Sequence, residues 1–204
     1  MIELTRGETA WTLTINRPEK ANSLTQSMLA TLADATEEAV RARVHALVLR
    51  GTGKVFSAGA DLDEARAGTL ATDPVWERLS GALAAAPCLT VAALNGTLAG
   101  GAMGMALACD LRLAVAEAKF FYPVMKLGFL PQPSDPKRLA ALVGPARAKM
   151  ILMAGQKISA EEALAWGLID RIVAPEEMDA ALESLLADVS QARPDHIGAI
   201  KALI

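Results

Sequence analysis

The spacing of hydrophobic residues changes twice within the first fifty residues. Trp11, Leu13 and Ile15 alternate with polar residues, and this period of two predicts a half-buried strand. From 27 to 43 apolar residues recur three and four positions apart, which predicts an amphipathic helix. A short apolar run at 46–49 follows and is typical of a buried parallel strand. The opening is therefore predicted to be strand, helix, strand.

The same alternation continues along the chain. Further helices are predicted at 74–86, up to 108, at 159–166 and at 176–191, with strands at 89–94 and 111–115. Ser159 and Glu162 have the spacing of a capping box, and Gly167 ends the helix that they begin. Glycine-rich turns are predicted at 51–62 and 95–101, and a mobile loop at 65–73. Strands that alternate with helices favour an α/β fold with a largely parallel sheet, in one domain spanning 1–204.

Composition narrows the class of protein. The 204 residues are 52% hydrophobic and 21% charged, which is the ordinary range of a globular domain. The net charge of −3 and the scattered basic residues argue against a nucleic-acid partner. The N-terminus does not resemble a secretory signal, and the longest uncharged apolar stretch, 98–109, is too short to span a bilayer. We expect a cytoplasmic protein without a membrane partner.

The two cysteines give no sign of a disulfide or a metal site. Cys88 and Cys109 both lie in apolar, alanine-rich segments. Such surroundings suit reduced thiols packed in a core. We therefore expect no bound metal.

Two glycine-rich turns are the candidates for chemistry. The segment GTGKVF suggests a phosphate loop, but it lacks the third glycine of a dinucleotide site and the Ser or Thr that follows GK in a P-loop. The turns SAGADL (57–62) and NGTLAGGAMG (95–104) each follow a buried strand. Glycine at a strand end lets backbone N–H groups point at a ligand, so two such turns suit an oxyanion hole with two donors. Taken singly, each turn is more often structural.

The order of these motifs resembles the crotonase, or enoyl-CoA hydratase/isomerase, superfamily. The resemblance rests on NRPEKANSL, FSAGADL, NGTLAGG and the pair CD, and it is extended by KFFYPVMKLGFLP and ISAEEALAWGLIDRIV over nearly the whole chain. It implies a ClpP/crotonase-type spiral of ββα units with a core at about 1–170. A C-terminal helical segment at about 175–204 is expected to be shorter than in the family, which would leave the acyl pocket open or completed by a partner.

The resemblance also implies the ligand, the assembly and the site. The ligand would be an acyl-coenzyme A thioester used in fatty acid metabolism, with coenzyme A as part of the substrate and no separate cofactor, and the assembly a homotrimer or homohexamer. The backbone N–H groups of Ala60 and Gly101 would hold the thioester oxygen. Coenzyme A would lie along a set of residues on two neighbouring turns: Lys20, Asn22, Leu24, Ala58, Ala60, Asp61, Leu62 and Asp63. Asp61 has a competing interpretation as the cap of the next helix.

The chain departs from the family where hydration needs two glutamates. Ungapped alignment places Gly104 and Val124 at those two positions, and neither side chain can transfer a proton. Isomerases of the family keep the second glutamate, so they are disfavoured as well. Replacement groups are sought among the nearby polar side chains: Asp63, Glu64, Glu77, Tyr122, Lys126 and Asp135.

Glu77 and Asp135 are the acid–base candidates that we retain, although each has a structural interpretation. Glu77 is expected on a solvated helix face, and Asp135 is expected to be an N-cap with Pro136 at the first helical position. The leading hypothesis is an acyl-CoA enzyme of lyase or isomerase type that stabilises an enolate. The alternative is a non-catalytic acyl-CoA-binding or scaffold subunit. A serine protease on the related Clp fold is disfavoured, because no Ser and His pair occupies suitable turns.

Overall fold

The computed structural model describes residues 1–68 and 70–204, which form two sheets. The larger sheet has the order β1 (Ile2–Arg6), β2 (Ala10–Ile15), β3 (Ala46–Gly51), β5 (Leu89–Leu94), β7 (Leu111–Val115) and β10 (Arg171–Val173). Only β1 is antiparallel to its neighbour, and the other pairs are parallel. The smaller sheet has the order β4 (Val55–Ser57), β6 (Thr97–Ala99), β8 (Lys119–Phe121) and β9 (Ile158–Ser159), with β9 antiparallel to β8.

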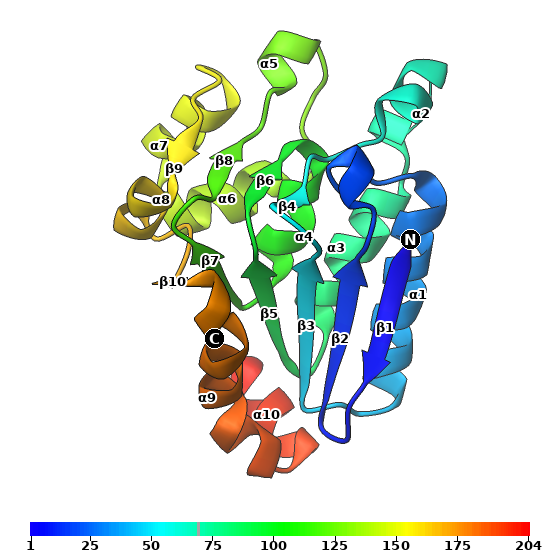
Figure 1. Cartoon of the computed structure of the whole chain (residues 1–204), viewed down its shortest axis with the longest axis vertical. Helices are drawn as coiled ribbons and strands as arrows, with labels where there is room; N and C mark the ends of the chain where they lie inside the picture. The colour runs from blue at the N-terminus through cyan, green and yellow to red at the C-terminus, as the bar shows by residue number, and fades with distance from the viewer. Residues whose placement is uncertain (69) are drawn as a thin grey trace.

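Successive units of the chain repeat one path. A strand of the larger sheet is followed by a strand of the smaller sheet and then by a helix. These units are β3, β4 and α2 (Leu62–Ala67), then β5, β6 and α4 (Met103–Ala108), then β7, β8 and α5 (Val124–Leu127). The predicted α/β spiral of ββα units is thereby confirmed. Because each unit runs in the same direction, the segments after β4, β6 and β8 gather at one end of the molecule, between α2 and α5 (Figure 1).

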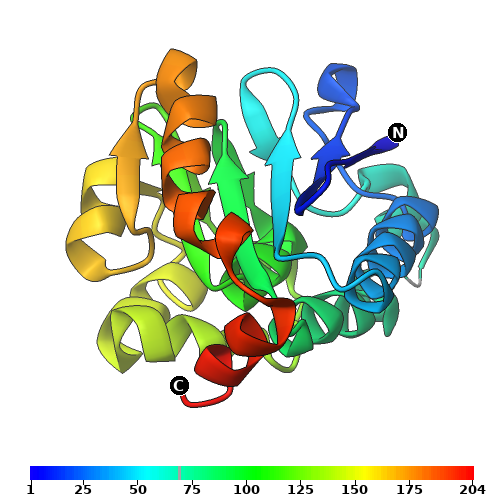
Figure 2. The same cartoon turned by 90° about the horizontal axis from the view of Figure 1, so that it is seen from below.

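The other helices lie outside these three units. They are α1 (Gln26–Arg41), α3 (Val75–Ala85), α6 (Asp135–Val143), α7 (Pro145–Leu152), α8 (Ala160–Trp166), α9 (Met178–Gln191) and α10 (Pro194–Lys201), with short 3-10 turns η1 (Pro18–Lys20), η2 (Leu70–Thr72), η3 (Gly100–Ala102) and η4 (Pro175–Glu177). Helices α1 and α3 pack together on one face, and α9 lies on the other (Figure 2). Both halves of the predicted capping box at Ser159 and Glu162 are present at α8.

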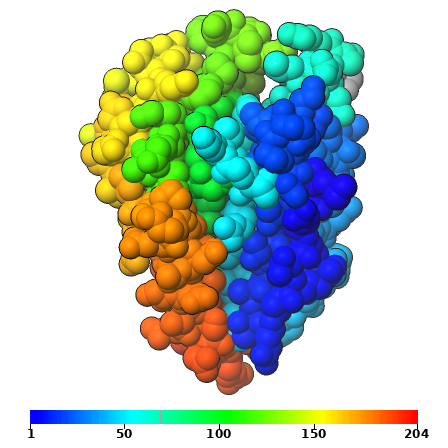
Figure 3. Space-filling view, viewed as in Figure 1, coloured from blue at the N-terminus to red at the C-terminus, as the bar shows by residue number. Residues whose placement is uncertain are grey.

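The C-terminal helices α9 and α10 are tied to the first half of the chain by two ion pairs. Arg50 of β3 pairs with Asp179 of α9 at 2.8 Å, and Arg43 pairs with Asp195 of α10. In the space-filling view the N-terminal strands and the helices α9 and α10 flank each other across this line (Figure 3). No helix in the described part of the chain is long and apolar enough to cross a membrane.

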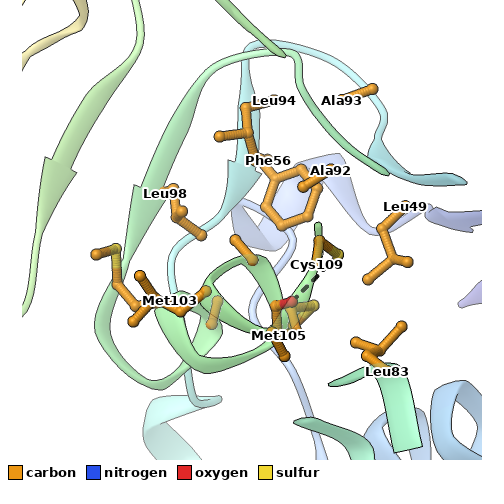
Figure 4. Close-up of a cluster of buried hydrophobic side chains, with 14 of the residues drawn as sticks. Leu49, Phe56, Leu83, Ala92, Ala93, Leu94, Leu98, Met103, Met105 and Cys109 are labelled. Carbon is orange, nitrogen blue, oxygen red and sulfur yellow. Dashed lines mark hydrogen bonds between the residues drawn. The ribbon is translucent and has the colours of Figure 1, made fainter. Parts of the chain in front are cut away.

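The core is built around α4, whose six residues are all buried. Side chains from β3, β4, α3, β5 and β6 converge on it, among them Phe56 near Ala92, and Leu98 beside Met103 (Figure 4). Cys109 donates to the Met105 carbonyl at 3.3 Å, and burial raises its pKa to about 12. Burial likewise raises the pKa of Cys88 to about 11. Both thiols are free and buried, as predicted, and such thiols are unreactive.

The structure corrects three predicted loops. The turns at 51–62 and 95–101 contain the short strands β4 and β6, and the loop at 65–73 contains the end of α2 and all of η2. Thr69 of that predicted loop lies outside the described residues. Strands of three residues are too short to express an alternation that can be read from sequence.

Candidate active site

The two glycine turns meet through their backbones. Leu24 pairs with Ala60 in an isolated parallel bridge, in which the Leu24 N–H donates to the Gly59 carbonyl and the Asp61 N–H donates to the Leu24 carbonyl, both at 2.8 Å. Successive N–H groups of an extended segment point to opposite sides, so the Ala60 N–H faces away from Leu24. A Cβ on Gly59 would lie 3.3 Å from the Gly101 nitrogen. The segment that holds Ala60 is therefore packed directly against Gly101.

A cavity of about 270 Å³ opens at this junction, and both Ala60 and Gly101 line it. Much of its remaining lining is apolar and comes from α2, α3, α5 and the segment after α5: Leu62, Trp76, Val124, Leu127, Phe129 and Leu130. Several of these side chains are exposed at its mouth, with Leu130 at 88%. The arrangement suits an apolar group lying beside backbone donors.

Trp76 forms the wall behind Gly101. A Cβ on Gly101 would lie 3.1 Å from the indole ring, so glycine is required for this close approach. The ring is fixed in place because its Nε1–H donates to the Leu70 carbonyl at 2.8 Å. The sequence places Trp76 in the predicted helix at 74–86, but gives no sign that it borders the candidate site.

Five of the eight residues predicted to contact coenzyme A separate into two groups. Ala58, Ala60 and Leu62 line the cavity. Lys20 and Asp63 are exposed and lie outside its lining. Arg66 of α2 does line the cavity, and it was missing from the sequence-based set because no motif marks it.

The other predicted contacts hold the turn together. Asn22 is fully buried, where its Oδ1 accepts from the Arg17 N–H at 2.8 Å and its Nδ2 donates to the Thr52 and Val55 carbonyls. Leu24 is fully buried beside Ala60. Their direct contact with coenzyme A stays a prediction, and their structural effect is to fix the segment that carries the Ala60 amide.

Asp61 is the helix cap that the competing interpretation expected. Its Oδ1 accepts from the N–H groups of Asp63 and Glu64, in the first turn of α2. Its Oδ2 pairs with the Arg17 guanidinium at 2.6 Å. The hydrogen bond from Arg17 lowers the pKa of Asp61, against the opposing effect of burial. Asp61 therefore ties η1 to the start of α2 as a carboxylate.

Neither Gly104 nor Val124 supplies a carboxylate, but a third residue fills the space at Gly104. A Cβ on Gly104 would lie 2.6 Å from Oδ1 and 3.0 Å from Oδ2 of Asp135. Asp135 is 1% exposed. Its Oδ2 accepts from the Tyr122 hydroxyl at 3.0 Å, whereas its Oδ1 has no partner among the described residues. The carboxylate of α6 thus lies against the backbone of α4.

The prediction that Asp135 is an N-cap is wrong. Ser134 is the N-cap of α6, and Asp135 is the first helical residue, ahead of Pro136. Glu77 accepts from the Ser134 N–H at 3.2 Å and from its hydroxyl at 2.9 Å. Glu77 is therefore half-buried, not solvated as predicted, and it stabilises the start of α6 while the Asp135 side chain turns inward.

Burial raises the pKa values of both Asp135 and Tyr122. It raises the pKa of Asp135 to about 7, with a smaller upward effect from Glu77 and opposing effects from Tyr122 and Arg138. Burial, together with the nearby Asp135, raises the pKa of Tyr122 far above its ordinary value. Near neutral pH, Asp135 is therefore close to the protonation equilibrium that suits a proton carrier.

The other proton-transfer candidates lie elsewhere. Glu64 accepts from the Gln26 N–H at 2.8 Å, and Asp63 and Lys126 are exposed. None of the three lines the cavity. Tyr122 does line it, together with Gln132, whose N–H donates to the Tyr122 hydroxyl at 3.4 Å. Of the six candidates, the structure brings Tyr122 and Asp135 into contact and keeps Glu77 nearby at Ser134.

The spiral of ββα units and the paired turns define a crotonase-type protein, and comparison with known sequences agrees. The chain belongs to the enoyl-CoA hydratase/isomerase family, whose model matches residues 5–204. YngF of Bacillus subtilis is 36% identical over 89% of the chain and 72% of its own length. The 1,2-epoxyphenylacetyl-CoA isomerase of Escherichia coli is 32% identical over 95% of the chain and 77% of its own length.

A solved structure has the same fold. The enoyl-CoA hydratase/isomerase from Pseudoalteromonas atlantica superposes with a TM-score of 0.91 at 30% identity, covering 99% of the chain and 81% of that structure. The backbone of the cavity is thus built on an architecture that this family shares.

Proposed function

We propose that the chain binds an acyl-coenzyme A thioester and polarises its carbonyl with the backbone N–H groups of Ala60 and Gly101. The observation that carries this proposal is the packing of the two glycine turns against each other at the edge of one cavity. Removal of an α-proton from a thioester develops negative charge on the carbonyl oxygen. Two preorganised donors favour that charge, and one such donor contributes about 2.7–4 kcal/mol in a comparable hole.

The cavity favours an apolar acyl group on the thioester. Its volume of about 270 Å³ and its leucine, valine and aromatic lining suit a short acyl chain. The phosphates of coenzyme A are too polar for this space, and they would lie outside it, where Arg66 provides a positive charge at the cavity lining. Coenzyme A takes part as a piece of the substrate.

The reaction type that fits is proton transfer at carbon and not hydration. Hydration requires one group to activate water and a second group to protonate the α-carbon. Gly104 and Val124 supply neither. Chemistry of isomerase type proceeds through the enolate and needs one proton carrier, which makes it compatible with the side chains present.

A non-catalytic acyl-CoA-binding subunit is the second candidate. It is favoured by the apolar Val124 at the cavity and by the filled space in front of Gly104. Both candidates require thioester binding, and they differ in turnover. Under either, we propose assembly as a homotrimer or homohexamer, which sedimentation at micromolar concentration would test.

Infrared difference spectroscopy tests the proposed polarisation directly. Butyryl-CoA labelled with ¹³C at the carbonyl should bind, raise the melting temperature by mass action and show its C=O stretch at lower frequency in the complex. A bound thioester with an unshifted carbonyl would contradict the two-donor arrangement. Gly101→Pro is a poorer test, because any Cβ at this position meets the Trp76 ring at 3.1 Å.

A further inference from the structure

A carboxylate occupies the place that the missing side chain of Gly104 would take. Gly104 is on α4, three residues beyond Gly101 of the second turn, and Asp135 begins the neighbouring helix α6. The Asp135 oxygens lie 2.6 and 3.0 Å from the position of a Cβ on Gly104. Glycine at 104 is therefore the residue that leaves room for Asp135.

The environment of Asp135 has the features of a functional group and not of a structural one. Its side chain is 1% exposed, and its Oδ1 has no hydrogen-bond partner in the described part of the chain. An unsatisfied buried carboxyl oxygen destabilises the fold, so such groups call for an explanation beyond packing. No capping role offsets this, because Ser134 is the N-cap of α6.

Tyr122 connects this carboxyl to the cavity. Its hydroxyl donates to Oδ2 of Asp135 at 3.0 Å and accepts from the Gln132 N–H at 3.4 Å. Tyr122 and Gln132 both line the cavity, and Asp135 is outside the lining. A proton that reaches Asp135 from the cavity has a path through the Tyr122 hydroxyl.

We propose that Tyr122 and Asp135 form one proton-transfer unit for the α-carbon of the bound thioester, with Asp135 replacing from α6 the carboxylate that Gly104 lacks on α4. This inference rests on the proposed binding of an acyl thioester beside Ala60 and Gly101. Tyr122 is the catalytic residue of the unit, and Asp135 acts through it.

The transfer is balanced without a further reactant. The α-C–H bond breaks, and its proton passes to the Tyr122 oxygen while the Tyr122 proton passes to the Asp135 carboxylate. The electron pair of the C–H bond forms the enolate, whose oxygen accepts hydrogen bonds from the amides of Ala60 and Gly101. Reversal returns the proton to carbon. Exchange of the α-protons follows when the Tyr122 hydroxyl, which then carries the former α-proton, trades it for a deuteron from the solvent before the reversal.

The charged neighbours of Asp135 keep it available for this role. Glu77 of α3 acts against its ionisation, whereas Arg138 of α6 and the Tyr122 hydroxyl favour it. The third helix against it, α4, contributes no titratable side chain. Exchange requires the carboxylate form, so its rate should rise with pH up to the pKa of Asp135 near 7.

The experiment measures exchange and binding in the same full-length proteins. Butyryl-CoA is incubated in D₂O, deuterium at the α-carbon is followed by mass spectrometry from pH 5.5 to 8.5, and the dissociation constant is measured by calorimetry. The variants are Tyr122→Phe and Asp135→Asn, which keep side-chain size. Asp195→Asn is the matched control, because Asp195 is exposed and pairs with Arg43 at the surface.

We expect wild type and Asp195→Asn to exchange the α-protons with a rate that rises toward pH 7. Both site variants should lose at least about 100-fold of that rate, as for a removed general acid–base group. Their affinities should stay within about three-fold of wild type, since the donors of the carbonyl are unchanged. The pH dependence should vanish in Asp135→Asn.

Each contrary result has its own meaning. Exchange that either variant retains, with binding intact, overturns the proton-transfer unit and leaves the proposed function standing. Wild-type binding without exchange also overturns it and favours the non-catalytic candidate. A wild-type protein that does not bind butyryl-CoA sinks the proposed function and this inference together.

Discussion

The Asp135 carboxylate and Gly104 are sterically coupled, because a Cβ at 104 would lie 2.6 Å from Oδ1. The atoms belong to neighbouring helices, α6 and α4, that are packed against each other in the core. Position 104 can therefore carry a side chain only if Asp135 moves or is shortened. This structure therefore has room for a glutamate at 104 or for an aspartate at 135, but not for both.

Gly104→Ala should destabilise the protein by about 1–3 kcal/mol, the usual effect of inserting a methyl group into a packed core. Urea unfolding measures the change. In Gly104→Ala with Asp135→Ala, the loss should be smaller than the sum of the two single changes by at least about 0.5 kcal/mol, since the clash is gone.

Gly81→Ala is the matched control for that experiment. Gly81 is in the interior of α3, and a Cβ there would meet no atom within 4 Å. This change should stabilise the protein by roughly 0.5–1 kcal/mol through helix propensity alone. Equal effects of alanine at 104 and at 81 would show that Asp135 does not occupy the space at 104.

Asp135 should make the protein less stable as pH rises from about 4 to about 7. Its pKa is about 7 in the folded chain and about 3.9 in an unfolded one. Between these values the folded state holds a proton that the unfolded state has lost. The free energy of unfolding should therefore fall by up to about 1.4 kcal/mol per pH unit, and level off above pH 7.

Unfolding of Asp135→Asn across this range isolates the effect. The variant cannot ionise, so its stability should lack this slope and should exceed that of wild type at pH 8. The pairing of Asp61 with Arg17 does not interfere, because a lowered pKa gives stability that is lost only as pH falls below about 4. Parallel curves for wild type and Asp135→Asn would show that the carboxyl titrates normally.

The sequence predicted the long elements well and the short ones poorly. Helix α1 and strands β3, β5 and β7 have enough residues to express a period or a buried run, and each was placed within a few residues. The short strands that form the smaller sheet have no such signal, although they position the glycine turns. The family resemblance supplied the sheet arrangement that periodicity could not.

The candidate site shows the same division. Motifs singled out the segments around Ala60 and Gly101, because glycine at a strand end has a local backbone reason. The contact between Asp135 and Gly104 has no local reason, since it depends on how α6 packs on α4. Asp135 before Pro136 has the spacing of an N-cap, and only the Glu77 hydrogen bonds to Ser134 show why that role fell to Ser134.

Wild-type protein should have negligible crotonyl-CoA hydratase activity. With Gly104 and Val124 at the two glutamate positions, as the ungapped alignment predicts, water activation and α-carbon protonation each lack an acid–base group, and one such group contributes about 10² to 10⁴-fold. The loss of absorbance of the conjugated thioester measures hydration, with an active hydratase as the positive control. Robust hydration by the purified chain would show that the Tyr122 and Asp135 pair, or another group, activates water.

The coupling at 104 also changes how a hydratase could be built on this chain. Gly104→Glu with Val124→Glu should fold poorly, because the Cβ of the new side chain at 104 would overlap the Asp135 carboxylate. Adding Asp135→Gly restores the space and should recover stability in urea unfolding. If adding Asp135→Gly to Gly104→Glu with Val124→Glu left the stability unchanged, positions 104 and 135 would be independent.

Trp76 should report acyl-CoA binding by fluorescence. Its indole borders the cavity and lies against Gly101, so a thioester carbonyl held by the Gly101 amide changes the polarity beside the ring. The other two tryptophans, Trp11 and Trp166, stack under Arg6 and Arg147 and are absent from the cavity lining. Titration with butyryl-CoA should therefore shift or quench the emission of wild type in a saturable way.

In Trp76→Phe the change should be lost, while calorimetry still detects binding, because phenylalanine keeps an aromatic wall behind Gly101. A signal that persists in Trp76→Phe would place the thioester away from the junction of the two turns, and the assignment of Ala60 and Gly101 as its carbonyl donors would fall with it.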